Sequence, residues 1–304
     1  MPTIRLNKNA PIVIVDCSYF VFYRLFASQK WWSFANKDAQ AAPRLDNPVF
    51  CDAFKKHMAA DIQKLMKKWG LVKGRGKNKI MAPENMIFAK DCRREDIWRM
   101  ELFPAYKGAR QVNKAFDPAA FPICLQELDA MTCPPTQQTG DLPTQTGDPP
   151  QTGPQIVSHP KLEADDVAAL LFKQIRAAHP THPITFITGD HDYLQLKDGP
   201  DGPTQIYAMP DKNLYEAGVK KGTHDLQRKI IKGDVSDNIA PVLKSKKHID
   251  AYMAATPDER EAMLRKLGPG YVEAFNLNKT LMCWSCIPAH LTESFDDKWQ
   301  VELA

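Results

Sequence analysis

Residues 11–16 read PIVIVD, a short run of mainly β-branched residues that ends in aspartate. The same pattern returns in MIFAKD at 86–91 and in ITFITGDHD at 184–192. Continuous apolar runs of this length are typical of strands buried on both faces of a parallel sheet. Ligands of such sheets bind beyond the carboxyl ends of the strands. The three runs therefore predict carboxylates at one edge of a sheet: Asp16, Asp91, Asp190 and Asp192.

Helical patterns separate the strand-like runs. From Phe50 to Trp69, apolar residues recur every three or four positions, as on one face of a helix. Asp117-Pro118 has the composition of an N-cap and first helical turn, and VAALLFKQIRAA at 167–178 continues as a helix. This alternation predicts an α/β fold with a mostly parallel central sheet flanked by helices.

The chain changes character twice along its length. Residues 132–155, TCPPTQQTGDLPTQTGDPPQTGPQ, repeat QTG among prolines and contain few apolar residues, which predicts a disordered insertion in a surface loop. After residue 215 the pattern is helical, and Thr256, Glu259 and Gly268 are placed to begin and end one of these helices. We therefore expect an α/β domain over 1–215 and a smaller helical lobe over 216–304.

Composition limits the class of protein. The 304 residues are 43% hydrophobic and 25% charged, as in ordinary globular proteins. No apolar run approaches the roughly 20 residues of a membrane helix, and the N-terminus lacks a signal-peptide core. The expectation is a cytoplasmic protein, or a nuclear one in a eukaryotic setting, that is monomeric and has no membrane partner. The seven cysteines predict reduced thiols, and CWSC at 283–286 is interpreted as packed thiols rather than a redox or metal motif.

Basic residues are clustered although the net charge is only +4. One cluster lies in KKWGLVKGRGKNK at 67–79, and the second comprises Lys244, Lys246 and Lys247. Basic patches beside an acidic centre suit a polyanionic ligand held next to bound cations. Two solvated loops are the alternative interpretation.

Residues 163–166 read EADD at the start of the predicted helix that continues through 167–178. Like charges about 4 Å apart repel by roughly 4 kcal/mol at an effective dielectric constant near 20. A helix N-terminus offsets part of this repulsion, and divalent cations would offset the rest. Acids that merely cap helices and turns are the alternative.

Nine carboxylates are candidates for one metal site. They are Asp16, Asp91, Glu163, Asp165, Asp166, Asp190, Asp192, Asp234 and Asp237, the last two from GDVSDN at 233–238. An all-oxygen set selects Mg²⁺ or Mn²⁺ over zinc or copper. Two such ions, about 3.5–4 Å apart, can clamp both oxygens of a phosphodiester displacement.

A cationic segment, RMELFPAYKGAR at 99–110, follows Asp91. The spacing of Arg99, Lys107 and Arg110, with Phe103 between them, predicts one helical face whose cations could meet a phosphate. Tyr106 offers an aromatic plane for stacking on an unpaired base. A solvated charged helix is the alternative.

Taken in order, these motifs resemble the flap endonuclease/5′→3′ exonuclease superfamily, which has a PIN-like fold. The resemblance covers an Asp that ends the first strand, an Asp followed by the Arg…YK…R segment, EADD, GDxD and GDxSDN. It extends over roughly residues 12–245 apart from the insertion. The eight-residue step from Asp91 to Arg99 and KGDVSDNIAPVLKSKKH at 232–248 are most similar to the phage RNase H type of 5′ nuclease.

The resemblance implies roles for particular residues. A first metal would be surrounded by Asp16, Asp91, Glu163, Asp165 and Asp190, and a second by Asp166, Asp192, Asp234 and Asp237. Asp165 and Asp190 would be central to catalysis, and Lys107 and Arg99 would contact the reacting phosphate. Nucleic acid would also be bound by Arg24, Tyr106, Arg110, Lys244, Lys246 and Lys247.

The implied activity is hydrolysis of nucleic acid from a 5′ end or flap, with two Mg²⁺ ions for which Mn²⁺ can substitute. Substrates would be duplex DNA and RNA–DNA hybrid, as in primer removal during DNA replication. A single-strand binding protein or a polymerase clamp is a candidate partner. The chain departs from most relatives after SDN, where Pro241-Val242 replaces a glycine-rich hairpin, so potassium-assisted duplex binding is not implied.

Two other functions fit parts of the sequence. A PIN-type endoribonuclease would cut RNA without needing a 5′ end, and a non-catalytic nucleic-acid-binding replication protein would have lost some of the acids.

Trp31 and Trp32 are expected either in the core or as a wedge against the end of a duplex.

Overall fold

The computed structural model describes residues 3–37, 43–74, 80–111, 113–132, 153–199, 201–221 and 225–304. Two sequence-based predictions therefore lie outside the described residues. They are the basic stretch at 75–79 and almost the whole of the proline-rich insertion, 133–152.

A six-stranded sheet forms the centre of the protein, with strand order β6-β5-β2-β7-β8-β9. Neighbouring strands are parallel except for the short hairpin between β8 and β9. The strands are β2 (Ile12–Asp16), β5 (Met86–Lys90), β6 (Gln155–Ser158), β7 (Ile184–Ile187), β8 (Thr204–Ala208) and β9 (Lys212–Asn213). The predicted α/β class and mostly parallel sheet are confirmed.

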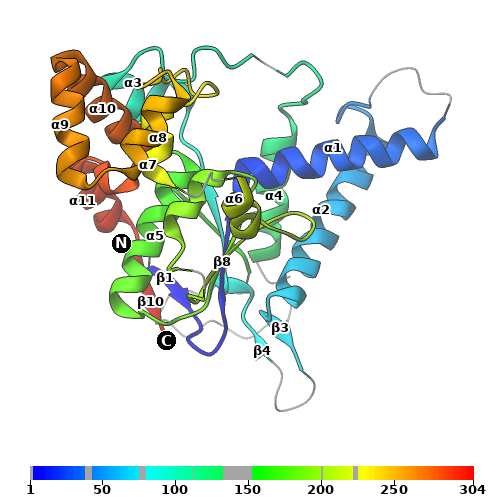
Figure 1. Ribbon diagram of the computed structural model, residues 1–304. Coiled ribbons are helices and arrows are strands. Elements are labelled where there is room, and N and C mark those ends of the chain that lie inside the picture. The colour runs from blue at the N-terminus through cyan, green and yellow to red at the C-terminus, as the bar shows by residue number, and fades with distance from the viewer. Residues whose placement is uncertain are drawn as a thin grey trace.

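Helices cover both faces of this sheet (Figure 1). Val13 and Val15 of β2 point into the hydrophobic cluster of α1 (Cys17–Ala35), α2 (Pro48–Lys68) and α4 (Ala120–Thr132). Ile12 and Ile14, on the opposite face of the same strand, pack in the cluster that contains α5 (Ala164–Ala178). Because successive strand residues point to opposite faces, the apolar run at 12–15 is buried throughout.

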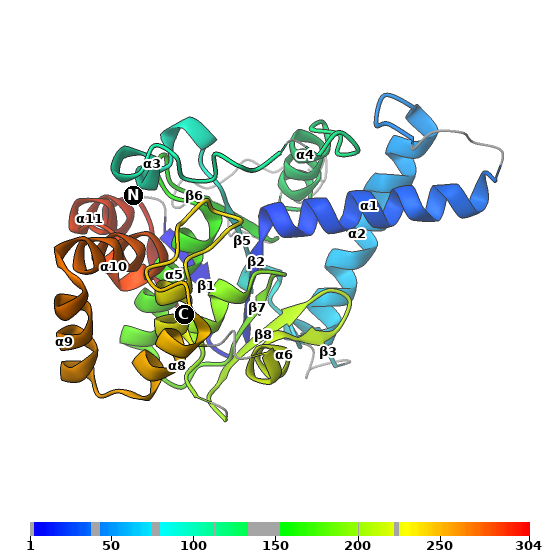
Figure 2. The same ribbon diagram turned by 45° about the horizontal axis from the view of Figure 1, so that its top comes forward.

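Helix α2 confirms the stripe predicted between Phe50 and Trp69. Asn47 caps its first turn, with Pro48 next, and Phe50, Phe54 and Met58 are fully buried. Trp32 packs against Phe50 with ring centroids 5.6 Å apart, whereas Trp31 is 44% exposed. Helix α1 projects away from the sheet in both Figures 1 and 2. The two tryptophans therefore have different environments, one packed and one accessible.

Two helix predictions need correction. The helix expected at Asp117 begins at Ala120, and Asp117 instead holds the preceding turn by accepting the N–H of Ala119 at 3.2 Å. The helix expected over 99–110 is only α3 (Trp98–Leu102). Pro104 explains its early end, because the residue before a proline is driven out of the helical region, and Phe103 has φ −140°.

The chain after residue 215 is largely helical, as predicted. Its elements, after α6 (Leu214–Lys221), are α7 (Leu226–Lys232), α8 (Lys246–Ala254), α9 (Pro257–Leu267), α10 (Pro269–Met282), α11 (Ala289–Lys298) and β10 (Gln300–Leu303). The capping box of Thr256 and Glu259 is present at the start of α9, and Gly268 ends it at φ +123°.

The proposed division of the chain at residue 215 stays a prediction. Side chains of α8 and α9 share a separate hydrophobic cluster with Ile231. However, α11 packs in the same core cluster as α5, and β10 pairs in parallel with β1 (Thr3–Leu6). The final part of the chain thus returns to the α/β layer instead of ending in the helical lobe.

The remaining described elements are small. They are the hairpin of β3 (Val72–Lys73) and β4 (Ile80–Met81), and the 3₁₀ turns η2 (Pro83–Asn85), η3 (Arg94–Asp96), η4 (His191–Leu196) and η5 (Trp284–Cys286). The six described cysteines are free thiols, and Cys283 Sγ contacts Ser285 Oγ at 3.0 Å. No helix among the described residues combines the length and apolar character needed to cross a bilayer.

Asn85 fixes the loop that leads into β2. Its side chain is fully buried, and Nδ2 lies 2.9–3.0 Å from the carbonyl oxygens of Asn7, Ala10 and Pro11. Its Oδ1 accepts the N–H of Asn7 at 2.7 Å. The side chain therefore joins the start of β5 to the start of β2, the two strands that deliver the first acids.

Replacing Asn85 with aspartate should destabilise the fold. The carboxylate has the same shape but cannot donate, so it would face three buried carbonyls, and the free energy of unfolding should fall by about 3 kcal/mol. Urea denaturation measures this change. Asn113→Asp is the control, because the side chain of exposed Asn113 accepts at Oδ1 from the N–H of Ala115 and donates no hydrogen bond within the described residues. Equal unfolding midpoints for both variants would contradict the role of Asn85.

Candidate metal centre

The sheet brings the three predicted aspartates to one edge. Strand β2 lies between β5 and β7, so Asp16, Asp91 and Asp190 all follow parallel neighbours at their carboxyl ends. Asp16 also caps α1 by accepting the N–H of Tyr19 at 2.9 Å, and Thr188 donates to its other oxygen at 3.1 Å. The predicted edge is therefore confirmed, and each aspartate is oriented by local hydrogen bonds.

The N-terminus of α5 adds the EADD acids to this edge. Glu163 is the N-cap and forms a capping box with Asp166. The N–H of Ala164 donates to Asp91 Oδ1 at 2.9 Å, which links α5 to the end of β5, and Ser18 donates to the other oxygen of Asp91. Oxygens of Glu163, Asp165 and Asp166 lie within 4.8 Å of one another.

Arg99 is buried among these acids and does not face solvent. Its side chain is 2% exposed, and its two Nη atoms lie 2.7 Å from the two oxygens of Asp166. Nη1 also donates to Glu163 at 3.0 Å, and Nε donates to the carbonyl of Leu281 at 2.7 Å. The expected phosphate contact of Arg99 is therefore corrected: the guanidinium is buried and orients two carboxylates.

Asp166 is the most enclosed of the acids. It is fully buried, and Trp98 Nε1 donates to Oδ2 at 2.9 Å beside the Arg99 pair. Both of its oxygens are therefore directed at nitrogen donors in this arrangement. Trp98 was not identified from the sequence, because its role depends on a hydrogen bond across 68 positions.

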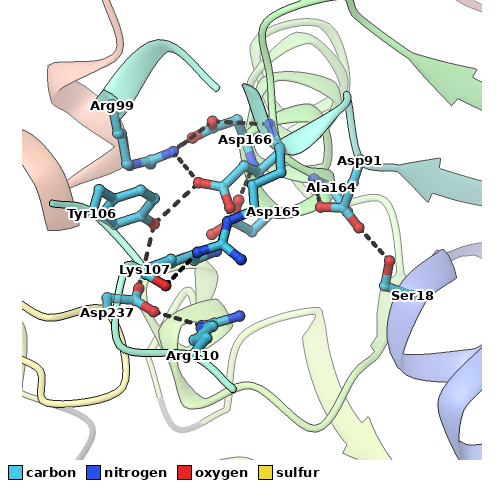
Figure 3. A network of polar contacts seen from close by, with 12 residues as sticks. Ser18, Asp91, Arg99, Tyr106, Lys107, Arg110, Ala164, Asp165, Asp166 and Asp237 are labelled. Atoms are coloured by element: carbon cyan, nitrogen blue, oxygen red, sulfur yellow. Dashed lines mark hydrogen bonds and ion pairs between the residues drawn. The ribbon is translucent and has the colours of Figure 1, made fainter. Parts of the chain in front are cut away.

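The segment after α3 lies against the acids (Figure 3). The Tyr106 hydroxyl donates to Glu163 at 3.0 Å, with Asp237 at 3.3 Å, and only 3% of the residue is exposed. The expected stacking on a base is thus corrected, because the ring of Tyr106 is buried. Lys107 pairs with Glu163, and its N–H donates to the carbonyl of Asp237 at 2.9 Å.

The predicted helical face of Arg99, Lys107 and Arg110 does not form. Lys107 has φ +55°, a left-handed conformation that a helix excludes. Arg110 is nevertheless close to the centre, since its guanidinium pairs with Asp237 at 2.5 Å while half of the side chain remains exposed. Turns rather than a helix thus bring both cations to the acids.

A second group of acids lies beside the first. Asp190 Oδ1 accepts the N–H of Asp192 at 2.9 Å, and Asp234 accepts from the N–H and hydroxyl of Ser236. The ammonium of Lys229 contacts Asp192 and lies 3.0 Å from Asp234. Lys229 was missed in the sequence, although its position one helical turn before GDVSDN was a usable signal.

A cavity of about 910 Å³ opens beside these residues. Its acidic wall includes Asp16, Asp190, Asp192 and Asp234. Its basic wall comes from α7, with Arg228, Lys229 and Lys232. The cavity is thus lined by both carboxylates and cations, as a site for a phosphate chain and metal ions requires.

The predicted nucleic-acid residues differ in exposure. Lys244, Lys246 and Lys247 are exposed at the start of α8, and Lys246 pairs with Asp250 at 2.6 Å. Arg24 does not have a free guanidinium as expected for phosphate binding, because it pairs with Asp61 and only 12% of either side chain is exposed. The three lysines are therefore accessible, whereas Arg24 is occupied.

Three carboxyls hold their protons unusually strongly. Burial and the charge of Asp91 raise the pKa of Asp16 to about 7. Burial and Asp165 raise the pKa of Glu163 to about 7, and burial and Asp190 do the same for Asp192. Crowded negative charge is thus not fully neutralised by the protein itself.

The residues present fit divalent cations. Among the described residues, five of the nine carboxylates form ion pairs with four cations: Arg99, Lys107, Arg110 and Lys229. The hydroxyl of Tyr193 is buried without a hydrogen-bond partner in the described part of the chain, and the charges of Asp16, Asp165, Asp91 and Asp190 all act on it. An oxygen-only donor set with excess negative charge selects hard cations such as Mg²⁺ or Mn²⁺.

Comparisons with known proteins identify the class. Residues 11–223 match the family model described as 5′-3′ exonuclease, N-terminal resolvase-like domain. The chain therefore belongs to the 5′-3′ exonuclease family. No curated protein matches it in sequence.

Solved structures of bacteriophage T5 proteins share the fold. A T5 5′-exonuclease with bound zinc ions aligns with TM-score 0.53 and 16% identity. The T5 D15 flap endonuclease, in a pseudo-enzyme-product complex with DNA and metal ions, aligns with TM-score 0.52 and 17% identity. Each alignment covers 94% of this chain and 97% of the other. At this identity, the likeness concerns the fold.

Metal binding should be tighter at pH 8 than at pH 6. Below pH 7 the raised pKa values leave protons on Asp16, Glu163 and Asp192, and a cation must release them to bind. The affinity for Mn²⁺ should fall at least about tenfold from pH 8 to pH 6, as isothermal titration calorimetry measures.

The metal-free chain supplies the matching control. A carboxyl whose pKa is raised by folding stabilises the fold below its unfolded value near pH 4, and this contribution is lost as pH rises through about 7. The apo stability due to these groups should thus fall between pH 5 and 8, and saturating Mg²⁺ should remove that fall. A pH-independent affinity for Mn²⁺ would contradict this account.

Proposed function

We propose that the chain is a metal-dependent 5′ nuclease that hydrolyses phosphodiesters at 5′ ends and flaps of duplex DNA and RNA–DNA hybrid. The observation that carries the proposal is the carboxylate centre at the sheet edge, with its excess negative charge, in a chain of the 5′-3′ exonuclease family. If these acids had a purely structural role, their mutual repulsion would lower the free energy of unfolding without a compensating interaction.

Two Mg²⁺ ions bound here would supply positive charge to the phosphate oxygens and activate the attacking water, with Mn²⁺ as a substitute. We assign one ion to Asp16, Asp91, Glu163, Asp165 and Asp190. The second is assigned to Asp192, Asp234 and Asp237. Asp166 is assigned a positioning role through Arg99, because both of its oxygens face donors.

The partly exposed cations Lys107 and Arg110 are proposed to meet the substrate. The side chain of Lys107 is 17% exposed and pairs with Glu163. A phosphate that enters the centre can therefore replace Glu163 as the partner of the Lys107 ammonium. Arg110 is half exposed at the rim and can reach the adjoining phosphate. Arg99 does not contact the substrate in this proposal; it orients the carboxylates of Glu163 and Asp166.

Substrate binding outside the centre is proposed to be electrostatic. Lys244, Lys246 and Lys247 would contact a duplex backbone without reading its sequence, and this binding would weaken with salt. Exposed Trp31 is proposed as a wedge at the duplex end. We further propose that the protein removes RNA primers during DNA replication. It would act as a monomer in the cytoplasm, which is the host cytoplasm if the protein is encoded by a phage. A single-strand binding protein or a polymerase clamp would recruit it.

Asp165→Asn should abolish cleavage. Asp165 is the acid of EADD without an ion pair in the described chain, so it remains available to a cation, and its loss should slow cleavage at least about 100-fold. The assay is single-turnover cleavage of a 5′-labelled flap with Mg²⁺, with binding measured separately. Asp258→Asn, an exposed acid of α9, is the control. Full turnover by Asp165→Asn at saturating Mg²⁺ would reject the assignment.

Substrate form separates this proposal from a PIN-type endoribonuclease. A 5′ nuclease should leave circular single-stranded RNA intact while it shortens the flap and the RNA strand of a hybrid. Cleavage of the circle would favour the endoribonuclease. Binding of the flap without any Mg²⁺-dependent product would favour a non-catalytic replication protein.

Lys107→Ala should affect the chemical step more than binding. If the ammonium acts on the transition state, the single-turnover rate should fall about 100-fold while the dissociation constant of the flap changes only a few-fold. Rapid-quench rates and fluorescence anisotropy measure the two quantities. Lys161→Ala, at an exposed ion pair with Glu101, is the control. A rate equal to that of the native chain would exclude the role.

A further inference from the structure

Lys229 joins two acids that come from distant segments. It belongs to α7, whereas Asp192 lies in η4 after β7, 37 positions earlier in the chain. The same ammonium lies 3.0 Å from Asp234, which follows α7. Side chains of Lys229, Asp192 and Asp234 are 24%, 16% and 19% exposed, so both contacts are partly shielded from water.

The other cations of the centre neutralise different acids. Arg99 and Lys107 pair with Glu163 and Asp166, and Arg110 pairs with Asp237. In the described part of the chain, Asp192 and Asp234 have ion pairs with Lys229 alone. These two acids thus depend on a single lysine for their positive charge.

An ammonium and a divalent cation compete for such a place. Mg²⁺ binds carboxylate oxygens at about 2.0–2.1 Å and demands near-octahedral geometry, so it needs the oxygen lone pairs that Lys229 now faces. Two cations beside the same carboxylates also repel each other strongly in a partly buried site. Both cannot hold Asp192 and Asp234 in the present arrangement.

We infer that Lys229 is an internal counter-ion that occupies the cation position between Asp192 and Asp234 until a divalent ion displaces its ammonium. This inference rests on the proposed function, since it concerns the second of the two metal positions. It makes that position the weaker one. The displaced ammonium remains at the cavity beside Arg228 and Lys232, where it can bind a phosphate of the substrate.

Chemical labelling of the native chain tests the displacement directly. Reductive methylation with and without saturating Mg²⁺, followed by peptide mass spectrometry, reports the accessibility of each lysine. Labelling of Lys229 should rise at least about threefold with Mg²⁺. Lys232 is the matched control, because it lies on the same helix and cavity but is exposed and without an ion pair in the described residues, so its labelling should not change. Unchanged or reduced labelling of Lys229 would overturn the inference.

Variants give a second, independent measurement. Lys229→Met removes the charge at nearly constant length, and Lys232→Met is its control. Titration of each metal-free chain with Mn²⁺, followed by the electron paramagnetic resonance of the free ion, yields the number and affinity of the sites. The weaker site should become at least about tenfold tighter in Lys229→Met and change less than about twofold in Lys232→Met.

The outcomes separate this inference from the proposed function. If the native chain binds Mn²⁺ but Lys229→Met binds it equally or more weakly, the lysine is a structural support and only the inference fails. If neither the native chain nor either variant binds Mn²⁺, and Mg²⁺ leaves the labelling of Lys229 unchanged, the proposed metal centre is itself rejected. The labelling experiment uses the native chain, so it tests the inference even if the Lys229→Met variant does not fold.

Discussion

Excess negative charge at one edge of a sheet is the constraint around which this protein is built. Parallel strands place Asp16, Asp91 and Asp190 side by side, and α5 adds further acids from its N-terminus. Burial raises the pKa of some of these carboxyls, and in the described part of the chain four cationic side chains offset the charge of others. Two unusual features of the site relate to this balance: the buried Arg99 and the bridging Lys229.

The cations divide into two kinds by their surroundings. Arg99 is enclosed and donates four hydrogen bonds to Leu281, Glu163 and Asp166, so it acts as a permanent part of the scaffold. Lys107 and Lys229 are partly exposed ammonium groups on flexible stems, and each contacts acids that a cation or substrate can claim. The enclosed Arg99 thus suits a fixed charge, whereas the partly exposed Lys107 and Lys229 suit exchangeable ones.

Sequence reasoning identified the acids and the sheet because both depend on local pattern. The apolar runs ending at Asp16 and Asp91 define buried parallel strands without reference to anything distant. It failed where position depends on tertiary contacts. Pro104 stops the helix that the charge spacing suggested, so Tyr106 turns inward, and Lys229 gains its role only because folding brings Asp192 beside it.

The bond from Arg99 to the carbonyl of Leu281 ties the acids of α5 to the far end of α10. The helices that follow the last acidic motif are therefore mechanically coupled to the centre. A shortened chain ending soon after GDVSDN would keep all nine carboxylates in its sequence, yet Arg99 would lose an anchor and the cluster its alignment. For this nuclease, possession of the reactive groups and possession of a working active site are separate properties.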